Sequence, residues 1–212
     1  MTSQELDARV RQIAVLPIII PQSVGYCIDV IGALAEGGAR GIEIVLRTPD
    51  ALSAIEVGIK TFPSLIFGAG TVLSIEQYDA VSEAGAQFAV SPGFLPALAA
   101  HAKHRAIPLV AGVQTATEVM AARAAGLHLL KFYPSEPAGG TDVLADFGHV
   151  FPDIGFMPSG MIDSTVLPKY AALSNVASVG GTWMHSEGGT SLDRAEIGRR
   201  MRLSLQAMAR PI

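Results

Sequence analysis

The stretch "GIEIVLRTPDALSAIEVGIKTFPSLIFGAGT" (residues 41–71) contains the structural unit that repeats along the chain. It opens with a short apolar run at 41–47 and closes with a second such run at 65–71. Short apolar runs rich in β-branched residues predict buried strands. The segment between them, 50–61, carries residues that favour helices and begins at Asp50, a residue type common at helix N-termini. The stretch therefore predicts a strand, a helix and a second strand.

The same alternation of apolar runs and Ala-rich helical segments extends in both directions. The predicted strands span 13–20, 41–47, 65–71, 87–92, 107–112, 128–134, 154–159 and 176–182. The predicted helices span 25–37, 50–61, 75–84, 95–105, 115–125, 140–148, 163–173 and 193–209. Residue types that cap helix N-termini precede several of them, at Asp50, Ser74, Thr115 and Asp163. Glycine follows others, where helices commonly end, at Gly37, Gly85 and Gly126.

Eight units of strand followed by helix in 212 residues predict a (β/α)8 barrel, also called a TIM barrel, with a short N-terminal helix. We expect one domain over residues 1–212, since no linker interrupts the pattern. An open, doubly wound sheet is the alternative architecture. The dinucleotide-binding fingerprint of such sheets is absent, because "GAG" at 68–70 lacks the third glycine.

Composition excludes several classes of protein. Half of the residues are hydrophobic and 16% are charged, which is ample material for a core, and the net charge of −4 argues against a nucleic-acid partner. No apolar run approaches the roughly 20 residues that cross a membrane, and the N-terminus lacks the pattern of a signal peptide. The single cysteine, Cys27, excludes an intramolecular disulfide. We expect a cytoplasmic protein that does not contact a membrane.

Polar residues gather where the predicted strands end. In a barrel, the carboxyl ends of the strands form the face that carries active sites. The residues placed there are Glu43, Arg47, Thr71, Ser91, Pro92, Gln114, Lys131, Tyr133, Ser159, Gly160, Gly180, Gly181 and Thr182.

Lys131 lies in the apolar stretch "LLKFYP" (129–134), where a lysine needs an explanation, because a buried ammonium without a partner is costly. Side chains alternate between the two faces of a strand. If Leu130 and Phe132 face the helices, Lys131 points into the barrel. The same alternation turns Glu43 inward, since isoleucines flank it on both sides. An amine and a carboxylate are thus expected to meet inside the barrel.

These residue types suit carbonyl chemistry. An amine kept partly neutral by burial and a nearby cation can attack a carbonyl and form a Schiff base. Arg47 could supply that cation and bind a carboxylate with two hydrogen bonds. Glu43 could carry protons during bond cleavage. The alternative is a purely structural ion pair between Glu43 and Lys131, but such a pair would require neither Arg47 nor the glycine-rich ends of the last two strands.

Other functions stay open at this point. "VGGT" (179–182) resembles a backbone anion site that leads towards a helix, where barrels commonly bind phosphate. A metal-dependent phosphosugar isomerase or epimerase is a second hypothesis, although the chain lacks the His-x-His and His-Glu-x-x-His patterns. His185 alone follows a strand end, and we expect it at the surface. A third hypothesis is a catalytically silent barrel that binds a small acid.

The motifs also resemble those of a known family. "GIEIVLRT", "GAGTVL", "GAQFAVSPG", "IPLVAGVQTATEV", "KFYPSE" and "VGGTW" follow one another as in the 2-keto-3-deoxy-6-phosphogluconate (KDPG) and 4-hydroxy-2-oxoglutarate aldolases, over about residues 13 to 185. The resemblance implies a (β/α)8 barrel that usually assembles as a homotrimer. It also implies a class I lyase without metal or cofactor, which cleaves KDPG or a related, epimeric or unphosphorylated 4-hydroxy-2-oxo acid to pyruvate and an aldehyde.

The resemblance assigns roles to individual residues. Lys131 would form the Schiff base, Glu43 would shuttle protons and Arg47 would hold the pyruvyl carboxylate. Substrate contacts would come from Thr71, Pro92, Tyr133, Ser159, Gly160, Met161, Gly180, Gly181 and Thr182. One motif departs from the family pattern "PTGG(I/V)", since this chain has "PSGMI" at 158–162. Met161 replaces a glycine of the phosphate site there, so its side chain either crowds a phosphate or leaves the backbone amide available to one.

Overall fold

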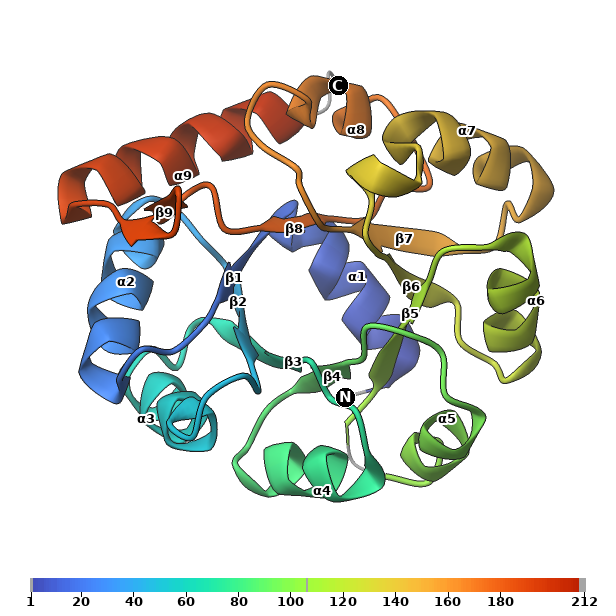
Figure 1. Ribbon diagram of the computed structural model, residues 1–212, viewed down its shortest axis with the longest axis horizontal. Helices are drawn as coiled ribbons and strands as arrows, with labels where there is room; N and C mark the ends of the chain where they lie inside the picture. Colours follow the sequence, from blue (N-terminus) through green and yellow to red (C-terminus); the bar gives the residue numbers. More distant parts are fainter. Residues whose placement is uncertain (1, 106, 210–212) are drawn as a thin grey trace.

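The chain folds into a barrel of parallel strands wrapped by helices (Figure 1). A computed structural model describes residues 2–105 and 107–209. The eight strands follow one another in the order β7-β6-β5-β4-β3-β2-β1-β8, and neighbours pair in parallel. The isolated bridges Phe156–Val176 and Ser159–Gly180 then connect the region of β7 with that of β8. The (β/α)8 prediction is confirmed, and the open sheet is wrong.

Each predicted strand and helix is present, with its ends shifted. The strands are β1 Val15–Ile19, β2 Gly41–Val45, β3 Ile66–Gly70, β4 Phe88–Val90, β5 Leu109–Val113, β6 Leu129–Phe132, β7 Gly155–Pro158 and β8 Val179–Gly181. The helices are α1 Ser3–Ile13, α2 Val24–Glu36, α3 Ala51–Thr61, α4 Ile75–Glu83, α5 Pro96–Ala102, α6 Ala116–Ala124, α7 Gly140–Val150, α8 Leu167–Ala171 and α9 Arg194–Met208. A short 3-10 turn (Glu136–Ala138) precedes α7, and a small hairpin, β9 Ser186–Glu187 with β10 Thr190–Ser191, precedes α9. Within the described ranges, none of the helices has the length and apolar character that a membrane crossing needs.

Helix ends follow the expected chemistry at some positions and depart from it at others. The Thr115 hydroxyl accepts the Glu118 N–H, and the Glu118 carboxylate accepts the Thr115 N–H, which forms a complete capping box. Asp50 makes no such side-chain bond. Asp50 still occupies the N-cap position of α3, whereas Asp163 is not a cap, since Val166 is the N-cap of α8. The Asp163 carboxylate instead accepts the backbone N–H of Thr165, 2.8 Å away. That local turn competes with helix formation, so α8 begins only at Leu167.

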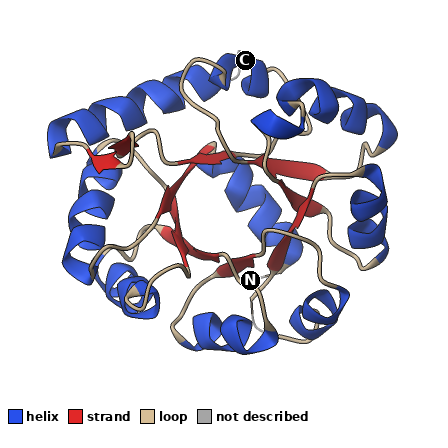
Figure 2. Cartoon of the chain, in the orientation of Figure 1, coloured by secondary structure: helices blue, strands red, loops and turns tan. Residues whose placement is uncertain are grey.

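Two apolar layers build the core. The outer layer lies between the strands and the surrounding helices and includes Ile42, Ile44, Leu130 and Phe132. The inner layer fills the barrel with side chains from Leu16, Phe88, Val90, Val110, Leu129 and Met157. Helix α1 joins this inner layer through Leu6, Val10 and Ile13. It crosses one opening of the barrel, and Figure 2 shows it through the ring of strands. Because α1 runs directly into the start of β1, it closes the N-terminal end and leaves the C-terminal end for a site.

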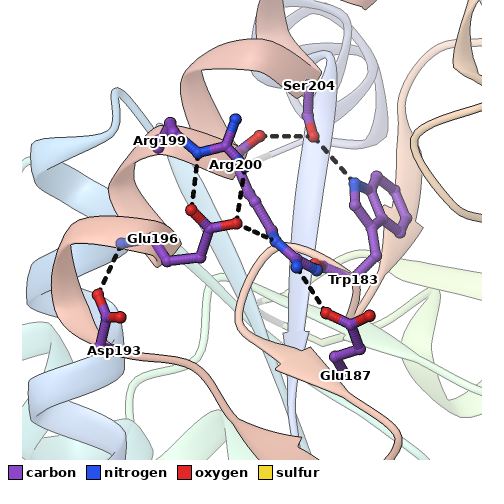
Figure 3. Close-up of polar contacts among 7 residues, drawn as sticks. All are labelled: Trp183, Glu187, Asp193, Glu196, Arg199, Arg200 and Ser204. Atoms are coloured by element: carbon purple, nitrogen blue, oxygen red, sulfur yellow. Dashed lines mark hydrogen bonds and ion pairs between the residues drawn. The ribbon is translucent and has the colours of Figure 1, made fainter.

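A polar network fixes the segment that follows β8 (Figure 3). The Trp183 indole N–H donates to the Ser204 hydroxyl at 2.9 Å, and this hydroxyl donates to the carbonyl of Arg200 at 2.8 Å. The Arg200 guanidinium in turn binds Glu196 and Glu187, at 2.7 and 2.6 Å. Helix α9 therefore holds the end of β8 through buried hydrogen bonds and an ion-pair network.

The closure of the barrel by α1 predicts a stability effect. Leu6→Ala removes a side chain that is 1% exposed and leaves a cavity between α1 and the inner layer. We expect the free energy of unfolding in urea to fall by about 2–5 kcal/mol. Leu203→Ala makes the same substitution on α9 at a side chain that is 48% exposed, and should change it by less than about 0.5 kcal/mol. Equal losses in the two variants would contradict the plugging role of α1.

Candidate active site

The barrel interior brings Lys131 of β6 and Glu43 of β2 into contact. The Lys131 Nζ donates to the Glu43 Oε1 over 3.2 Å. Both residues are buried, with exposures of 8% for Lys131 and 1% for Glu43. Their neighbours Leu130 and Phe132 lie in the outer layer, as the alternation predicted. A charged pair in such a setting is stabilised by mutual attraction, and removal of either partner leaves a buried charge uncompensated.

Glycine on the adjacent strand makes room for the carboxylate. Gly70 of β3 pairs with Val45 of β2, beside Glu43. A Cβ added at Gly70 would lie 2.1 Å from the Glu43 Oε1, closer than any real contact. The buried Glu43 carboxylate therefore requires glycine at position 70. This requirement gives a steric reason for the second glycine of the motif "GAGT".

Arg47 and Thr71 meet at the open end of the barrel. The Arg47 Nε donates to the Thr71 hydroxyl at 3.2 Å. Strand alternation alone would place Thr71 with Phe67 and Ala69, which lie in the outer layer. Instead, the strand ends at Gly70 and Thr71 takes a left-handed backbone with φ of 59°, so its hydroxyl reaches Arg47. Among the described residues, Arg47 has no acidic partner, so its guanidinium is available to an anion.

A cavity of about 220 Å³ opens beside Lys131. Its walls come from the ends of β1, β2, β6, β7 and β8. The lining residues are Ile18, Ile20, Val45, Arg47, Lys131, Tyr133, Ser159, Gly160, Met161, Ile162, Gly181 and Thr182. Eight of the predicted site residues thus share one cavity, and Glu43 lies behind it in contact with Lys131.

Besides Glu43, three predicted site residues do not line this cavity. Thr71 accepts a hydrogen bond from Arg47, and Arg47 lines the cavity. Pro92 packs its backbone against Gly112 of β5, where an added Cβ would lie 2.2 Å from the Pro92 carbonyl carbon. Gly180 faces Ser159 across the bridge that joins the two last strand ends.

Two side chains in the cavity, Tyr133 and Ser159, are placed where they can contact a ligand. The Tyr133 ring lies beside the amine, with its centroid 5.5 Å from the Lys131 Nζ, in a cation–π arrangement. The Ser159 hydroxyl is buried and has no hydrogen-bond partner among the described residues. Its backbone is fixed, because the N–H of Ser135 donates to the Ser159 carbonyl at 2.8 Å. A buried hydroxyl without a partner is costly unless something else satisfies it, and a ligand can do so.

Met161 stands out on the rim of the cavity. Its backbone is left-handed, with φ of 58°, and its side chain is 81% exposed. A left-handed backbone costs a residue with a side chain about 1–2 kcal/mol. In the described part of the chain, Ala14 and Thr71 are the only other residues besides glycine with a positive φ. Two of these three strained positions therefore lie at the site.

Other parts of the site differ from the sequence-based expectations. His185 is buried, not at the surface, and its Nε2 donates to the Ile18 carbonyl at 2.9 Å. Burial lowers the pKa of this imidazole, which favours its neutral form. The glycines of "VGGT" do not lead directly into a helix, since α9 begins only at Arg194. Gly181 is needed for a different reason, because a Cβ there would lie 1.9 Å from the Trp183 ring.

Sequence reasoning missed the apolar part of the cavity. Ile18 and Ile20 at the end of β1, and Ile162 after β7, line it beside the polar residues. A search of the C-terminal end of β1 would have found Ile18 and Ile20, but aliphatic side chains do not by themselves indicate a functional role. No cluster of three or more His, Cys, Asp or Glu side chains that could hold a metal occurs in residues 2–105 and 107–209.

Fold and site together define a barrel enzyme with a buried amine for carbonyl chemistry. The family model "KDPG and KHG aldolase" matches residues 6–199. The 2-dehydro-3-deoxy-phosphogluconate aldolase of Pseudomonas aeruginosa is 38% identical over 97% of this chain and 92% of its own length. The KHG/KDPG aldolase of Escherichia coli is 39% identical over 80% of each chain. The chain belongs to the KDPG and KHG aldolase family.

Solved structures agree with this assignment. The Zymomonas mobilis ZM4 aldolase for 2-keto-3-deoxy-6-phosphogluconate, crystallised with 3-phosphoglycerate, superposes with a TM-score of 0.90 at 34% identity and covers 96% of both chains. The KDPG aldolase of Legionella pneumophila was captured with pyruvate as a covalent carbinolamine intermediate. It superposes with a TM-score of 0.84 at 34% identity, covering 98% of this chain and 97% of that one.

The contact at Gly70 predicts a catalytic effect. Gly70→Ala forces the Glu43 carboxylate away from its position, since the added carbon would lie 2.1 Å from the Oε1. A misplacement of this size lowers kcat by about 100-fold. The measurement is pyruvate release from whichever 4-hydroxy-2-oxo acid the protein cleaves faster. Gly25→Ala is the matched control, because an added Cβ there meets nothing within 4 Å. A folded Gly70→Ala protein with unchanged kcat would show that the carboxylate position does not matter.

Proposed function

We propose that this protein is a class I aldolase that cleaves KDPG, or a related 4-hydroxy-2-oxo acid, to pyruvate and an aldehyde. For KDPG the aldehyde is glyceraldehyde 3-phosphate. The observation that carries the proposal is the buried contact of 3.2 Å between the Lys131 Nζ and the Glu43 Oε1, beside a cavity at the open end of the barrel. The carbinolamine in the Legionella pneumophila relative supports the same chemistry.

The first half of the reaction forms the imine. The substrate carboxylate binds the free guanidinium of Arg47, which brings C2 to Lys131. The Lys131 ammonium gives a proton to the Glu43 carboxylate, and the resulting neutral amine attacks the C2 carbonyl. A proton then moves from the nitrogen to the oxygen to give a carbinolamine. Glu43, 3.2 Å from the Nζ, donates a proton to the departing hydroxyl, so that water leaves and the imine forms.

The second half breaks the C3–C4 bond. Glu43, directly or through a water molecule, removes the proton of the C4 hydroxyl. The electron pair of the C3–C4 bond then moves into the imine, which gives an enamine and releases the aldehyde. Protonation at C3 and hydrolysis of the imine return pyruvate and the free amine of Lys131. A single carboxylate next to the nitrogen can serve each of these transfers in turn.

The remaining predicted residues position the substrate. Thr71 holds the Arg47 guanidinium by the 3.2 Å hydrogen bond. Tyr133 lies beside the amine and would bound the pyruvyl part. Pro92, whose backbone packs against Gly112 on β5, next to β6, would support the same side. Ser159 offers its free buried hydroxyl to the more distant part of the substrate. Gly160, Gly180, Gly181 and Thr182 would contribute backbone and hydroxyl groups at the same end.

We also propose that the protein acts as a homotrimer in the cytoplasm. Association is supported by large apolar side chains left exposed at Leu73, Leu95 and Met120. A cytoplasmic setting suits the one cysteine, Cys27, which is a free and buried thiol.

The Schiff base is open to a direct chemical test. Borohydride added in the presence of pyruvate should reduce the imine and leave a stable pyruvyl adduct on Lys131, found by peptide mapping. The exposed lysines Lys60, Lys103 and Lys169 are internal controls and should stay unmodified. Lys131→Met, which keeps the length of the side chain without the amine, should give no adduct. Modification of an exposed lysine alone, or none at all, would leave only the structural interpretation of the Glu43–Lys131 pair.

A further inference from the structure

The pyruvyl part of the proposed substrate lies between two strand ends. Its carboxylate would bind Arg47, after β2, and its C2 atom would bond to Lys131, in β6. In the barrel order, β1, β8 and β7 lie between these two strands on the side where the cavity opens. Everything beyond C4 of the substrate, hereafter its tail, must therefore lie against the residues that follow those three strands.

The wall on that side is mostly apolar. Ile18 and Ile20 come from β1 and its end, and Met161 and Ile162 follow β7. Polar groups there are the hydroxyls of Ser159 and Thr182, together with backbone at two glycines. A wall of this kind favours carbon and hydroxyl groups over a charged one.

No cation remains for a second anion. Among the residues that line the cavity, the positive charges are those of Arg47 and Lys131. Arg47 is assigned to the carboxylate of the keto acid, and Lys131 is paired with Glu43. A dianionic tail would lose its hydration at the apolar wall without gaining an opposite charge.

Met161 points to the same conclusion by a separate observation. It keeps a left-handed backbone that glycine would adopt without strain, and its long apolar side chain is 81% exposed at the rim. Strain of this kind at a ligand site often serves function. The flexible thioether can pack against a bound apolar group, so the side chain would lose its exposure when the tail is in place.

We propose that this cavity selects 4-hydroxy-2-oxo acids whose C4 substituent is uncharged, and that Met161 is the residue that sets this specificity. The inference rests on the proposed aldolase function. The uncharged tail packs between Met161, Ile20 and Ile18, and any hydroxyl groups it carries bond to Ser159 or Thr182.

The test uses the reverse reaction, the addition of pyruvate to an aldehyde. Glyceraldehyde is the uncharged probe and glyceraldehyde 3-phosphate is its phosphorylated counterpart. Glyoxylate carries a charge without the bulk of a phosphate. The native protein should use glyceraldehyde with a kcat/KM at least about tenfold higher than either charged aldehyde. Equal rates for glyoxylate and glyceraldehyde would show that the wall does not select by charge and would overturn the inference.

Variants at one position separate the role of Met161 from that of the loop. Met161→Gly should raise kcat/KM for glyceraldehyde 3-phosphate about tenfold and lower it for glyceraldehyde, because the apolar rim is lost. Met161→Leu keeps the apolar volume and should keep the native preference. Ala14→Gly replaces another residue with a positive φ, directly before β1 and away from the cavity, and should change neither rate.

The outcomes are distinct. A native protein that prefers the phosphorylated aldehyde would overturn the inference and leave the aldolase proposal intact. A native preference for glyceraldehyde that Met161→Gly does not alter would overturn the role of Met161. Failure to trap pyruvate on Lys131, together with no addition to any aldehyde, would remove the proposed function and the inference with it.

Discussion

The contact between the Lys131 ammonium and the Glu43 carboxylate is the constraint on which the rest of the site depends. The two residues come from β6 and β2, which the strand order separates by three other strands, so only a closed barrel brings them within 3.2 Å. Desolvation of two charges is costly unless geometry and additional groups compensate. Gly70 gives the carboxylate its space, and the open end of the barrel beside Arg47 gives the pair access to a ligand. The fold therefore places the proposed nucleophile and its proposed proton carrier together.

The two ends of the barrel have different structural roles. At one end, Leu6, Val10 and Ile13 of α1 pack onto the inner apolar layer and exclude water. At the other end, the strands finish in polar and glycine-rich segments whose positions are fixed from outside. The Trp183–Ser204 hydrogen bond does this after β8, and the bond from the Ser135 N–H to the Ser159 carbonyl does it after β7. Stability and chemistry are thus separated along the barrel axis, which allows the rim to change without loss of the core.

Much of this arrangement can be predicted from the sequence. Strands and helices differ in the spacing of their hydrophobic residues, and active-site residues of barrels lie at the C-terminal ends of the strands. The alternation around Lys131 and Glu43 was enough to predict that both side chains turn inward. Side-chain patterns could not predict Thr71, which reaches Arg47 through a left-handed backbone beyond its strand. His185 was expected at the surface but is buried, since its ring bonds a carbonyl of distant Ile18. Such long-range packing, like the local turn at Asp163, is decided by tertiary contacts that periodicity does not encode.

In the proposed mechanism, Glu43 moves protons for the imine formed on Lys131. Exchange of the pyruvate methyl protons with D2O, followed by NMR, tests it without any aldehyde. The native protein should exchange these protons, because the imine and enamine interconvert by proton transfer at C3. Lys131→Met should not exchange them at all. Glu43→Gln should still form, although more slowly, the pyruvate adduct that borohydride traps, and should exchange the protons at least about 100-fold more slowly than the native protein. Exchange at the native rate in Glu43→Gln would contradict the account.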